Sequence, residues 1–263
     1  MIATEHRVSE LVTMYKKLAN VLNPETKSKA LEISNYVTGQ NLIKSLSSLN
    51  ISTILDVGGG SGDRSAFLAK NGFEVTLLDS DTELLQAAAE KFHKQDLIIN
   101  MLVGDIENMP FQNEAFDLVI AEGGIISLTD DPIKMIKEFR RITKPGGYIW
   151  IDYLNLIGWS VLQPDVETRM MLANKEEEVI YMGKDKFPLK FFSPKKLRYL
   201  LYDCGFLELN EFGNGILTNP MMEDQKINGA ESEMKKTELE LSRNYNLIGA
   251  AFHIQVLAQK IIY

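Results

Sequence analysis

Short apolar runs alternate along the chain with longer stretches in which apolar residues recur every three or four positions. The apolar runs lie at 51–57, 73–78, 97–103, 116–121 and 148–153, and two more follow at 206–213 and 250–258. Runs of this length predict buried strands, and the periodic stretches between them predict amphipathic helices. Strands that alternate with helices indicate an α/β fold.

Capping residues mark where several of these helices begin. Asp131 and Pro132 start one of them, because an acid followed by proline in the first turn favours a helix start. Its apolar stripe consists of Ile133, Ile136, Phe139 and Ile142. The sequence Lys-Pro-Gly-Gly at 144–147 is expected to end this helix and to turn the chain into the strand at 148–153.

The segment 54–81 combines a strand, a glycine turn, a helix and a second strand. The second strand ends at Asp79. Glycines let the backbone approach a ligand closely, and an acid after the second strand can accept both hydroxyls of a ribose. The segment therefore predicts a βαβ unit that binds a nucleoside.

The spacing of the glycines separates two kinds of nucleoside. A dinucleotide-binding turn needs the pattern G-x-G-x-x-G, whose third glycine would fall on Asp63. The chain instead has Asp56, two positions ahead of a turn that consists of Gly58, Gly59, Gly60, Ser61 and Gly62. This motif resembles the first motif of the class I S-adenosylmethionine-dependent methyltransferases. The resemblance implies that S-adenosylmethionine is the cofactor and that Asp56 and these glycines hold its methionine end.

Two further positions match motifs of the same family. The resemblance implies that Asp79, with Ser80 beside it, binds the ribose hydroxyls. It also implies that Asp105 receives the adenine amino group and that Ile106 covers the adenine ring. A Gly-Asp pair after the strand at 97–103 is by itself an ordinary turn. Because it follows Asp79 at the expected distance, it favours adenine binding.

The Lys-Pro-Gly-Gly segment is also similar to the region ahead of the fifth strand in these methyltransferases, so the resemblance covers 51–153. It implies a Rossmann-like α/β fold with a seven-stranded, mostly parallel sheet, helices on both faces and an antiparallel last strand. We expect an N-terminal helical cap at 1–50, the cofactor-binding core at 51–153, and a variable insertion over the substrate site at 154–192. The remainder, 193–263, is expected to complete the same α/β domain.

Residues 4–49 show helical periodicity, in two or three pieces interrupted near Asn23-Pro24 and Gly39. One interpretation, implied by the resemblance, is a segment that closes over the cofactor and substrate. The other is a segment that covers the sheet or pairs with a second subunit. Tyr36 is selected as a cofactor-lining residue, because it lies just ahead of the helix that leads into the first strand. The first apolar stripe consists of Val8, Leu11, Val12, Tyr15, Leu18 and Leu22.

Candidate catalytic residues lie at the ends of the fourth and fifth strands, where ligands of open α/β sheets bind. Glu122 follows Ala121, which we expect beside the cofactor, and Asp152 and Tyr153 end the fifth strand. Each acid has a structural alternative: Glu122 can cap a helix or contact the cofactor, and Asp152 can bind backbone amides. His253 begins an apolar strand and is expected to be a core histidine.

Several methyltransferase types are disfavoured by missing motifs. The fourth strand is not followed by the N-P-P-Y signature of amino-methylating nucleic-acid enzymes, and no acid and asparagine cluster matches the metal-dependent catechol-type enzymes. The chain resembles the branch that includes ubiquinone and menaquinone methyltransferases and natural-product tailoring enzymes. The expected acceptor is a small molecule or short peptide with an oxygen, nitrogen or activated carbon nucleophile. The alternatives are an NAD-dependent reductase and a non-catalytic nucleoside-binding sensor or partner protein.

Composition and charge restrict the partners further. The net charge of −8 and the sequence pI near 5.1 disfavour binding to a nucleic-acid backbone. The first ten residues lack the pattern of a signal peptide, and the apolar stretch at 148–162 is too short to span a bilayer. We therefore expect a cytoplasmic monomer or homodimer without a membrane span. The single cysteine, Cys204, excludes an internal disulfide and a cysteine-based metal site, and no metal is expected.

Overall fold

A computed structural model describes residues 29–182, 186–218 and 229–262. The N-terminal stripe at 8–22 and the break predicted near Asn23-Pro24 lie outside the described residues. So do His6, Arg7 and Tyr15, three residues of the N-terminal segment that could line a site.

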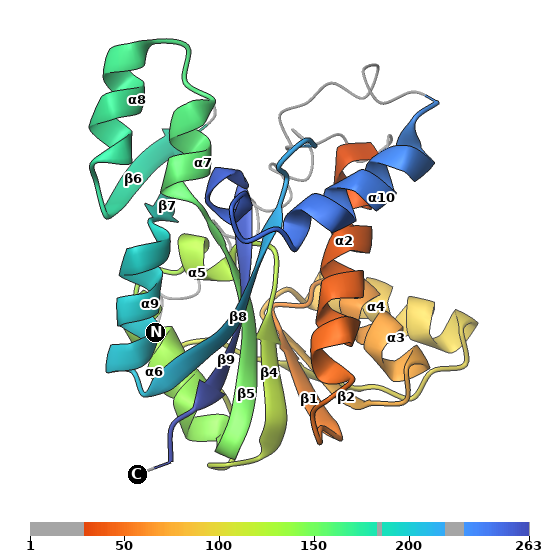
Figure 1. Cartoon of the computed structure of the whole chain (residues 1–263). Helices are drawn as coiled ribbons and strands as arrows, with labels where there is room; N and C mark the ends of the chain where they lie inside the picture. The colour runs from red at the N-terminus through yellow and green to blue at the C-terminus, as the bar shows by residue number, and fades with distance from the viewer. Residues whose placement is uncertain (1–28, 183–185, 219–228, 263) are drawn as a thin grey trace.

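The centre of the molecule is a seven-stranded sheet in the order β3-β2-β1-β4-β5-β9-β8 (Figure 1). The first five strands run parallel, while β9 is antiparallel to both of its neighbours. This confirms the predicted sheet with its antiparallel last strand. The strands are β1 Thr53–Val57, β2 Glu74–Asp79, β3 Asn100–Val103, β4 Phe116–Ala121, β5 Thr143–Leu154, β8 Phe206–Asn214 and β9 His253–Lys260.

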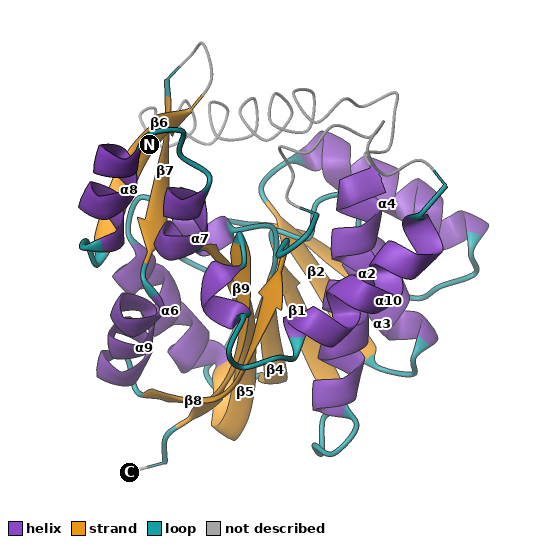
Figure 2. Cartoon of the chain, turned by 45° about the horizontal axis from the view of Figure 1, so that its top comes forward, coloured by secondary structure: helices purple, strands orange, loops and turns teal. Residues whose placement is uncertain are grey.

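Helices cover both faces of the sheet, as Figures 1 and 2 show. On one face α2 Lys29–Leu46 and α3 Asp63–Lys70 bury Leu42, Leu46 and Leu68 against the sheet. On the same side, α4 Thr82–Lys94 packs on α3 and β2. On the opposite face α6 Pro132–Ile142 and α9 Pro194–Asp203 pack against the strands. Cys204 is buried in that second cluster.

Three local predictions differ from the structure. Helix α2 continues through Gly39 without a break, because glycine only weakens a helix and packing against the sheet outweighs that cost. Ile133 is exposed, and Met135 takes its place in the buried stripe of α6. The fifth strand begins at Thr143, so the glycines at 146 and 147 lie inside β5.

The segment expected to be a variable insertion folds into two short helices and a hairpin. These elements are α7 Leu156–Val161, α8 Val166–Ala173, β6 Glu177–Met182 and β7 Phe187–Phe192, and they stand above one end of the sheet (Figure 1). An aromatic cluster of Trp159, Phe191 and Phe252 joins the hairpin to α7 and to the chain ahead of β9.

Helix α10 Glu231–Ser242 packs along α2 on the outside of the molecule (Figure 2). Glu231 and Lys235 are spaced for an ion pair within a helix, but each makes another contact in the structure. Glu231 pairs with Lys29 of α2, while the Lys235 ammonium lies 5.8 Å from the centre of the Tyr36 ring. Among the described residues, no helix is both long enough and apolar enough to cross a membrane.

Candidate functional site

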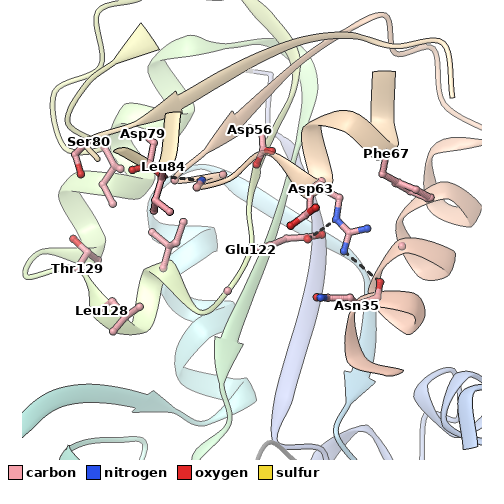
Figure 3. A pocket seen from close by; sticks show the side chains of 18 of the residues that line it. Asn35, Asp56, Asp63, Phe67, Asp79, Ser80, Leu84, Glu122, Leu128 and Thr129 are labelled. Carbon is pink, nitrogen blue, oxygen red and sulfur yellow. Dashed lines mark hydrogen bonds and ion pairs between the residues drawn. The ribbon is translucent and has the colours of Figure 1, made fainter. Parts of the chain in front are cut away.

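A cavity of about 790 Å³ lies where the parallel strands end. Helix α2 and α5 Ile125–Leu128 contribute to its wall. Figure 3 shows its side chains, several of which come from segments far apart in the sequence. The residues predicted from sequence that line it are Tyr36, Asp56, Gly58, Gly59, Gly60, Asp79, Ser80, Asp105, Ile106 and Glu122.

The glycine turn forms one wall of the cavity. Gly58, Gly60 and Gly62 have positive φ angles of 63°, 54° and 74°, a region that other residues adopt at a cost. The backbone N–H of Gly60 donates a 2.8 Å hydrogen bond to the Asp79 carboxylate, which fixes the turn to the end of β2. Gly62 does not line the cavity. It is the N-cap of α3 and packs tightly against Phe92.

Asp79 is buried at the end of β2. Besides the bond from Gly60, it accepts a 2.8 Å hydrogen bond from the backbone N–H of Asp81. Burial raises the pKa of Asp79, while these backbone donors act in the opposite direction. Each carboxylate oxygen has two lone pairs, so Asp79 can still accept hydrogen bonds from a ligand in the cavity.

Asp56 lies deeper, at the end of β1. The hydroxyl of Ser65 donates a 2.5 Å hydrogen bond to its carboxylate. Desolvation by burial is the main cause that raises the pKa of Asp56 to about 7, and the Ser65 bond partly offsets it. A cationic group placed beside Asp56 would favour the ionised carboxylate.

Asp105 and Ile106 follow β3 on the other side of Asp79. Asp105 accepts a 2.8 Å hydrogen bond from the backbone N–H of Glu107 and forms an isolated bridge with Asn108. This turn holds the two residues beside the cavity, which Glu107 also lines. The ends of β1, β2 and β3 thus bring Asp56, Asp79 and Asp105 to one cavity.

Glu122 is engaged by two partners. Its Oε2 accepts a 2.6 Å hydrogen bond from Nε of Arg64 in α3, and its Oε1 accepts a 2.9 Å bond from the indole N–H of Trp150. Burial raises the pKa of Glu122, whereas the Arg64 guanidinium lowers it. With both oxygens bonded, Glu122 is an ion-pair partner first and a poor candidate for a general base.

Arg64 and Asn35 were not identified from the sequence, although both line the cavity. Arg64 also donates to the backbone oxygen of Asn35 in α2, at 3.5 Å (Figure 3). A Cβ at Gly39 would lie 2.9 Å from the Arg64 guanidinium, so the glycine lets α2 approach α3 closely. Gly39, where an interruption of the helix was predicted, is therefore the point at which α2 contacts α3. This glycine is the sequence signal that could have located α2 beside the site.

Asp152, Tyr153 and Ala121 lie outside the cavity wall. Asp152 accepts a 2.6 Å hydrogen bond from the backbone N–H of Gly124, so its predicted alternative of binding backbone amides is observed. Tyr153 follows Asp152 in β5 and therefore points to the opposite face of the sheet, where it is fully buried in the core below α6 and α9. We assign Tyr153 no further role in the site. Ala121 is buried at the end of β4.

The charge in the cavity fits a cationic nucleoside. Of the described residues that line it, one carries a guanidinium, Arg64, and seven carry carboxylates: Asp56, Asp63, Asp79, Asp105, Glu107, Glu122 and Asp130. Within 29–182, 186–218 and 229–262, no group of three or more histidine, cysteine or carboxylate side chains is arranged to hold a metal ion. The pocket therefore suits hydroxyl and ammonium donors of an organic ligand.

Comparison with known proteins points to the same type of ligand. A family model described as "Methyltransferase domain" matches residues 55–151. The demethylmenaquinone methyltransferase of Chlorobaculum tepidum is 34% identical over 155 residues, which cover 57% of this chain and 62% of that protein. The ubiquinone/menaquinone biosynthesis C-methyltransferase of Rickettsia rickettsii is 31% identical over 188 residues, covering 64% of this chain and 73% of that protein. The chain thus spans less than two thirds of the first of these relatives and nearly three quarters of the second.

Among solved structures, a 1,6-didemethyltoxoflavin-N1-methyltransferase from Burkholderia thailandensis shares the fold, with a TM-score of 0.64. The match covers 98% of this chain and 90% of that one at 12% identity. That structure contains 1,6-didemethyltoxoflavin and S-adenosylhomocysteine. At this low identity the likeness bears on the fold alone.

Proposed function

We propose that this chain, which belongs to the class I S-adenosylmethionine-dependent methyltransferases, transfers the methyl group of S-adenosylmethionine to a small-molecule acceptor. The observation that supports this most is the convergence of Asp56, Asp79 and Asp105 on one cavity beside the glycine turn. Three acids from the ends of three neighbouring strands can each hold a different part of one extended nucleoside.

Each part of the cofactor has a proposed position. Asp79, with Ser80 beside it, receives the ribose hydroxyls, while Asp105 receives the adenine amino group and Ile106 covers the ring. Asp56 and the glycine turn lie on the side of the cavity that suits the methionine end. There the Asp56 carboxylate would be stabilised by the positive charge of the cofactor. Tyr36 of α2 lines the same cavity.

The cofactor supplies an electrophilic methyl group on a sulfonium. The residues of the chain have to hold the acceptor behind that methyl group and to exclude water. Alignment of two reactants can lower a barrier by about 7 to 11 kcal/mol at the limit measured for oriented systems. The Arg64–Glu122 ion pair contributes by fixing α2 and α3 to the end of β4, so that the wall of the cavity is preformed.

The acceptor is proposed to be small and to carry an apolar ring. A cavity of about 790 Å³ has to hold both reactants, which leaves little room for a peptide. The wall of the cavity includes apolar side chains from two helices: Phe67 of α3, and Ile125 and Leu128 of α5. The named relatives act in menaquinone and ubiquinone biosynthesis, and a quinol-like acceptor suits this wall.

A thermal-shift comparison of S-adenosylmethionine, S-adenosylhomocysteine and NAD tests the proposal. A ligand at 100 times its dissociation constant adds about 2.7 kcal/mol to the free energy of unfolding. We expect both sulfur nucleosides to raise the melting temperature and NAD to leave it unchanged. Stabilisation by NAD alone would support a reductase instead. Binding of the sulfur nucleosides without methyl transfer to any of a panel of quinols, catechols and amines would support a non-catalytic sensor.

A further inference from the structure

His253, the first residue of β9, lies against Asp152 at the edge of the sheet that carries the cavity. Nδ1 of His253 is 3.6 Å from Oδ2 of Asp152, and this buried nitrogen has no hydrogen-bond partner within the described part of the chain. The other oxygen of Asp152 is fixed by the backbone N–H of Gly124 at 2.6 Å. The carboxylate is therefore oriented with one oxygen on the turn after β4 and the other facing the imidazole.

The imidazole lies behind the turn after β4, next to residues that line the cavity. Its Cε1 lies 3.8 Å from the position that a Cβ at Gly124 would occupy, and the preceding Gly123 lines the cavity. His253 shares a face of β9 with Gln255, which donates to Thr38 of α2. The ring thus lies on the face that α2 covers, at the end of the sheet where the cavity opens.

The imidazole of His253 is not a core histidine whose two ring nitrogens both have hydrogen-bond partners, because its Nδ1 has none among the described residues. Its side chain is 21% exposed. The ring approaches Asp152 and packs against the ring of Phe252, at 5.1 Å between centroids. A carboxylate at Nδ1 favours the tautomer with the proton on Nδ1 and leaves the Nε2 lone pair able to accept a proton.

We propose that His253 is the general base of the methyl transfer and that Asp152 is the residue that positions it. This rests on the function proposed above, and it narrows the acceptor to a molecule that carries a hydroxyl group. A base is useful only where the attacking atom carries a proton that has to leave. Glu122, the other acid near this end of the cavity, already bonds Arg64 and Trp150 through its two oxygens.

The step balances in atoms and charge. The hydroxyl oxygen of the acceptor attacks the methyl carbon, and the hydroxyl proton moves to Nε2 of His253. The bond between the methyl carbon and the sulfonium sulfur breaks, and its electron pair stays on the sulfur. The products are the methyl ether, S-adenosylhomocysteine and an imidazolium, whose charge the Asp152 carboxylate stabilises until the proton passes to water.

Among the described residues, few charged groups compete for the imidazole. Asp152 on β5 is the nearest of them. Glu122, which follows β4 and interacts electrostatically with Asp152, is paired with Arg64 of α3. The elements packed on the other sides contribute polar but uncharged side chains. These are Asn214 of β8, which pairs with His253 in the sheet, and Ser34 and Thr38 of α2, to which Asn214 donates.

Four variants of the full chain test the proposal: His253→Gln, His253→Gly, Asp152→Asn and the control His93→Gln. His93 is an exposed residue at the end of α4. Asn at position 152 keeps an oxygen for the Gly124 N–H, so the fold around the turn is preserved. The reaction is followed with S-adenosylmethionine and the members of a panel of hydroquinones and catechols, and binding is followed by titration with S-adenosylhomocysteine.

We expect His253→Gln to lower kcat by about 100-fold or more, in line with the usual contribution of a general base, and to remove the ascending limb of the pH–rate profile. The affinity of the variant for S-adenosylhomocysteine should stay within about twofold of that of the wild type, because neither His253 nor Asp152 lines the cofactor end of the cavity. Added imidazole should restore part of the activity of His253→Gly but should not affect His253→Gln. The control His93→Gln should behave as the wild type.

A second readout does not depend on turnover. ¹⁵N chemical shifts of labelled histidine should show the proton of neutral His253 on Nδ1, and Asp152→Asn should move it towards Nε2. If the proton of neutral His253 lies on Nε2 in the wild type, His253 is not the general base. The same conclusion follows if the wild type is active and His253→Gln keeps its kcat and its pH profile. A wild type that binds S-adenosylhomocysteine but methylates no acceptor, amines included, would overturn the proposed function and the base with it.

Discussion

Nε of Arg64 lies 2.6 Å from Oε2 of Glu122, and this ion pair joins the helix after the glycine turn to the end of β4. Both side chains are mostly buried, with exposed fractions of 13% and 15%. Because the same guanidinium reaches the backbone of Asn35, the pair links three elements of the cavity wall. Its loss should therefore affect stability and cofactor binding together.

Removing only one partner of this pair should cost more than removing both. Arg64→Met leaves the Glu122 carboxylate buried without its cation, and breaking a buried pair in this way costs about 3 kcal/mol or more. The double variant Arg64→Met/Glu122→Gln keeps the oxygen that accepts from Trp150 and should recover much of that loss. Urea unfolding of both proteins measures the difference, and equal stabilities would show that the pair contributes little.

Asp79→Asn should weaken cofactor binding. The amide cannot accept through both of its ends, so the hydrogen bonds of Asp79 to the glycine turn or to the ribose are lost. A hydrogen bond to a charged group contributes about 1.5 to 3 kcal/mol, which corresponds to roughly a 10- to 100-fold rise in the dissociation constant of S-adenosylhomocysteine.

Asp117→Asn is the matched control for Asp79. Asp117 lies near the opposite end of the sheet, where it accepts from the backbone of Ser52 and Thr53 and pairs with Lys144. Its variant should lose stability without losing affinity in the same titration. Equal affinity losses in the two variants would mean that the effect of Asp79 is general destabilisation.

Asp56 should make the protein less stable as the pH rises. Burial raises the pKa of Asp56 from an ordinary value of 3.8 to about 7 in the folded protein. The group therefore contributes stability that is fully present below about pH 4 and is lost as the pH rises through about 7. The free energy of unfolding of the wild type, relative to Asp56→Asn, should fall between pH 5 and pH 8. A constant or rising difference would contradict the buried, protonated carboxyl.

Gly158→Ala should destabilise the junction between α7 and the chain ahead of β9. A Cβ at this position would overlap the backbone oxygen of Ala251, and overpacking of this kind costs about 1 to 3 kcal/mol. Gly249→Ala, in the 3₁₀ turn at Ile248–Ala250, has open space around its Cβ and should be neutral. Thermal melts compare the two, and S-adenosylhomocysteine affinity should be unchanged in both.

Much of the core was predictable because its signals are local. The glycines, the acid that ends β2 and the Gly-Asp pair after β3 lie within short segments whose order fixes the strands. Since the carboxyl ends of parallel strands meet at one edge, Asp56, Asp79 and Asp105 had to come together once the sheet was known. The antiparallel β9 came with the family resemblance.

The rest depended on contacts between distant segments. The ion pair of Arg64 with Glu122, and the approach of α2 at Gly39, involve residues that are 58 and 25 positions apart, and no periodicity in either segment indicates them. The hairpin β6–β7 was hidden because charged and apolar residues do not alternate regularly in 177–192. His253 was expected to be satisfied in the core, and its nearest ionisable neighbour, Asp152, became visible only in the folded chain.

A crystal structure of the protein with S-adenosylhomocysteine tests the central claim most directly. We expect the adenine beside Asp105 and Ile106, the ribose hydroxyls on the carboxylate of Asp79, and the amino acid end along the glycine turn near Asp56. Density for the nucleoside at any other place, or carboxylates 79 and 105 turned away from it, would contradict the account.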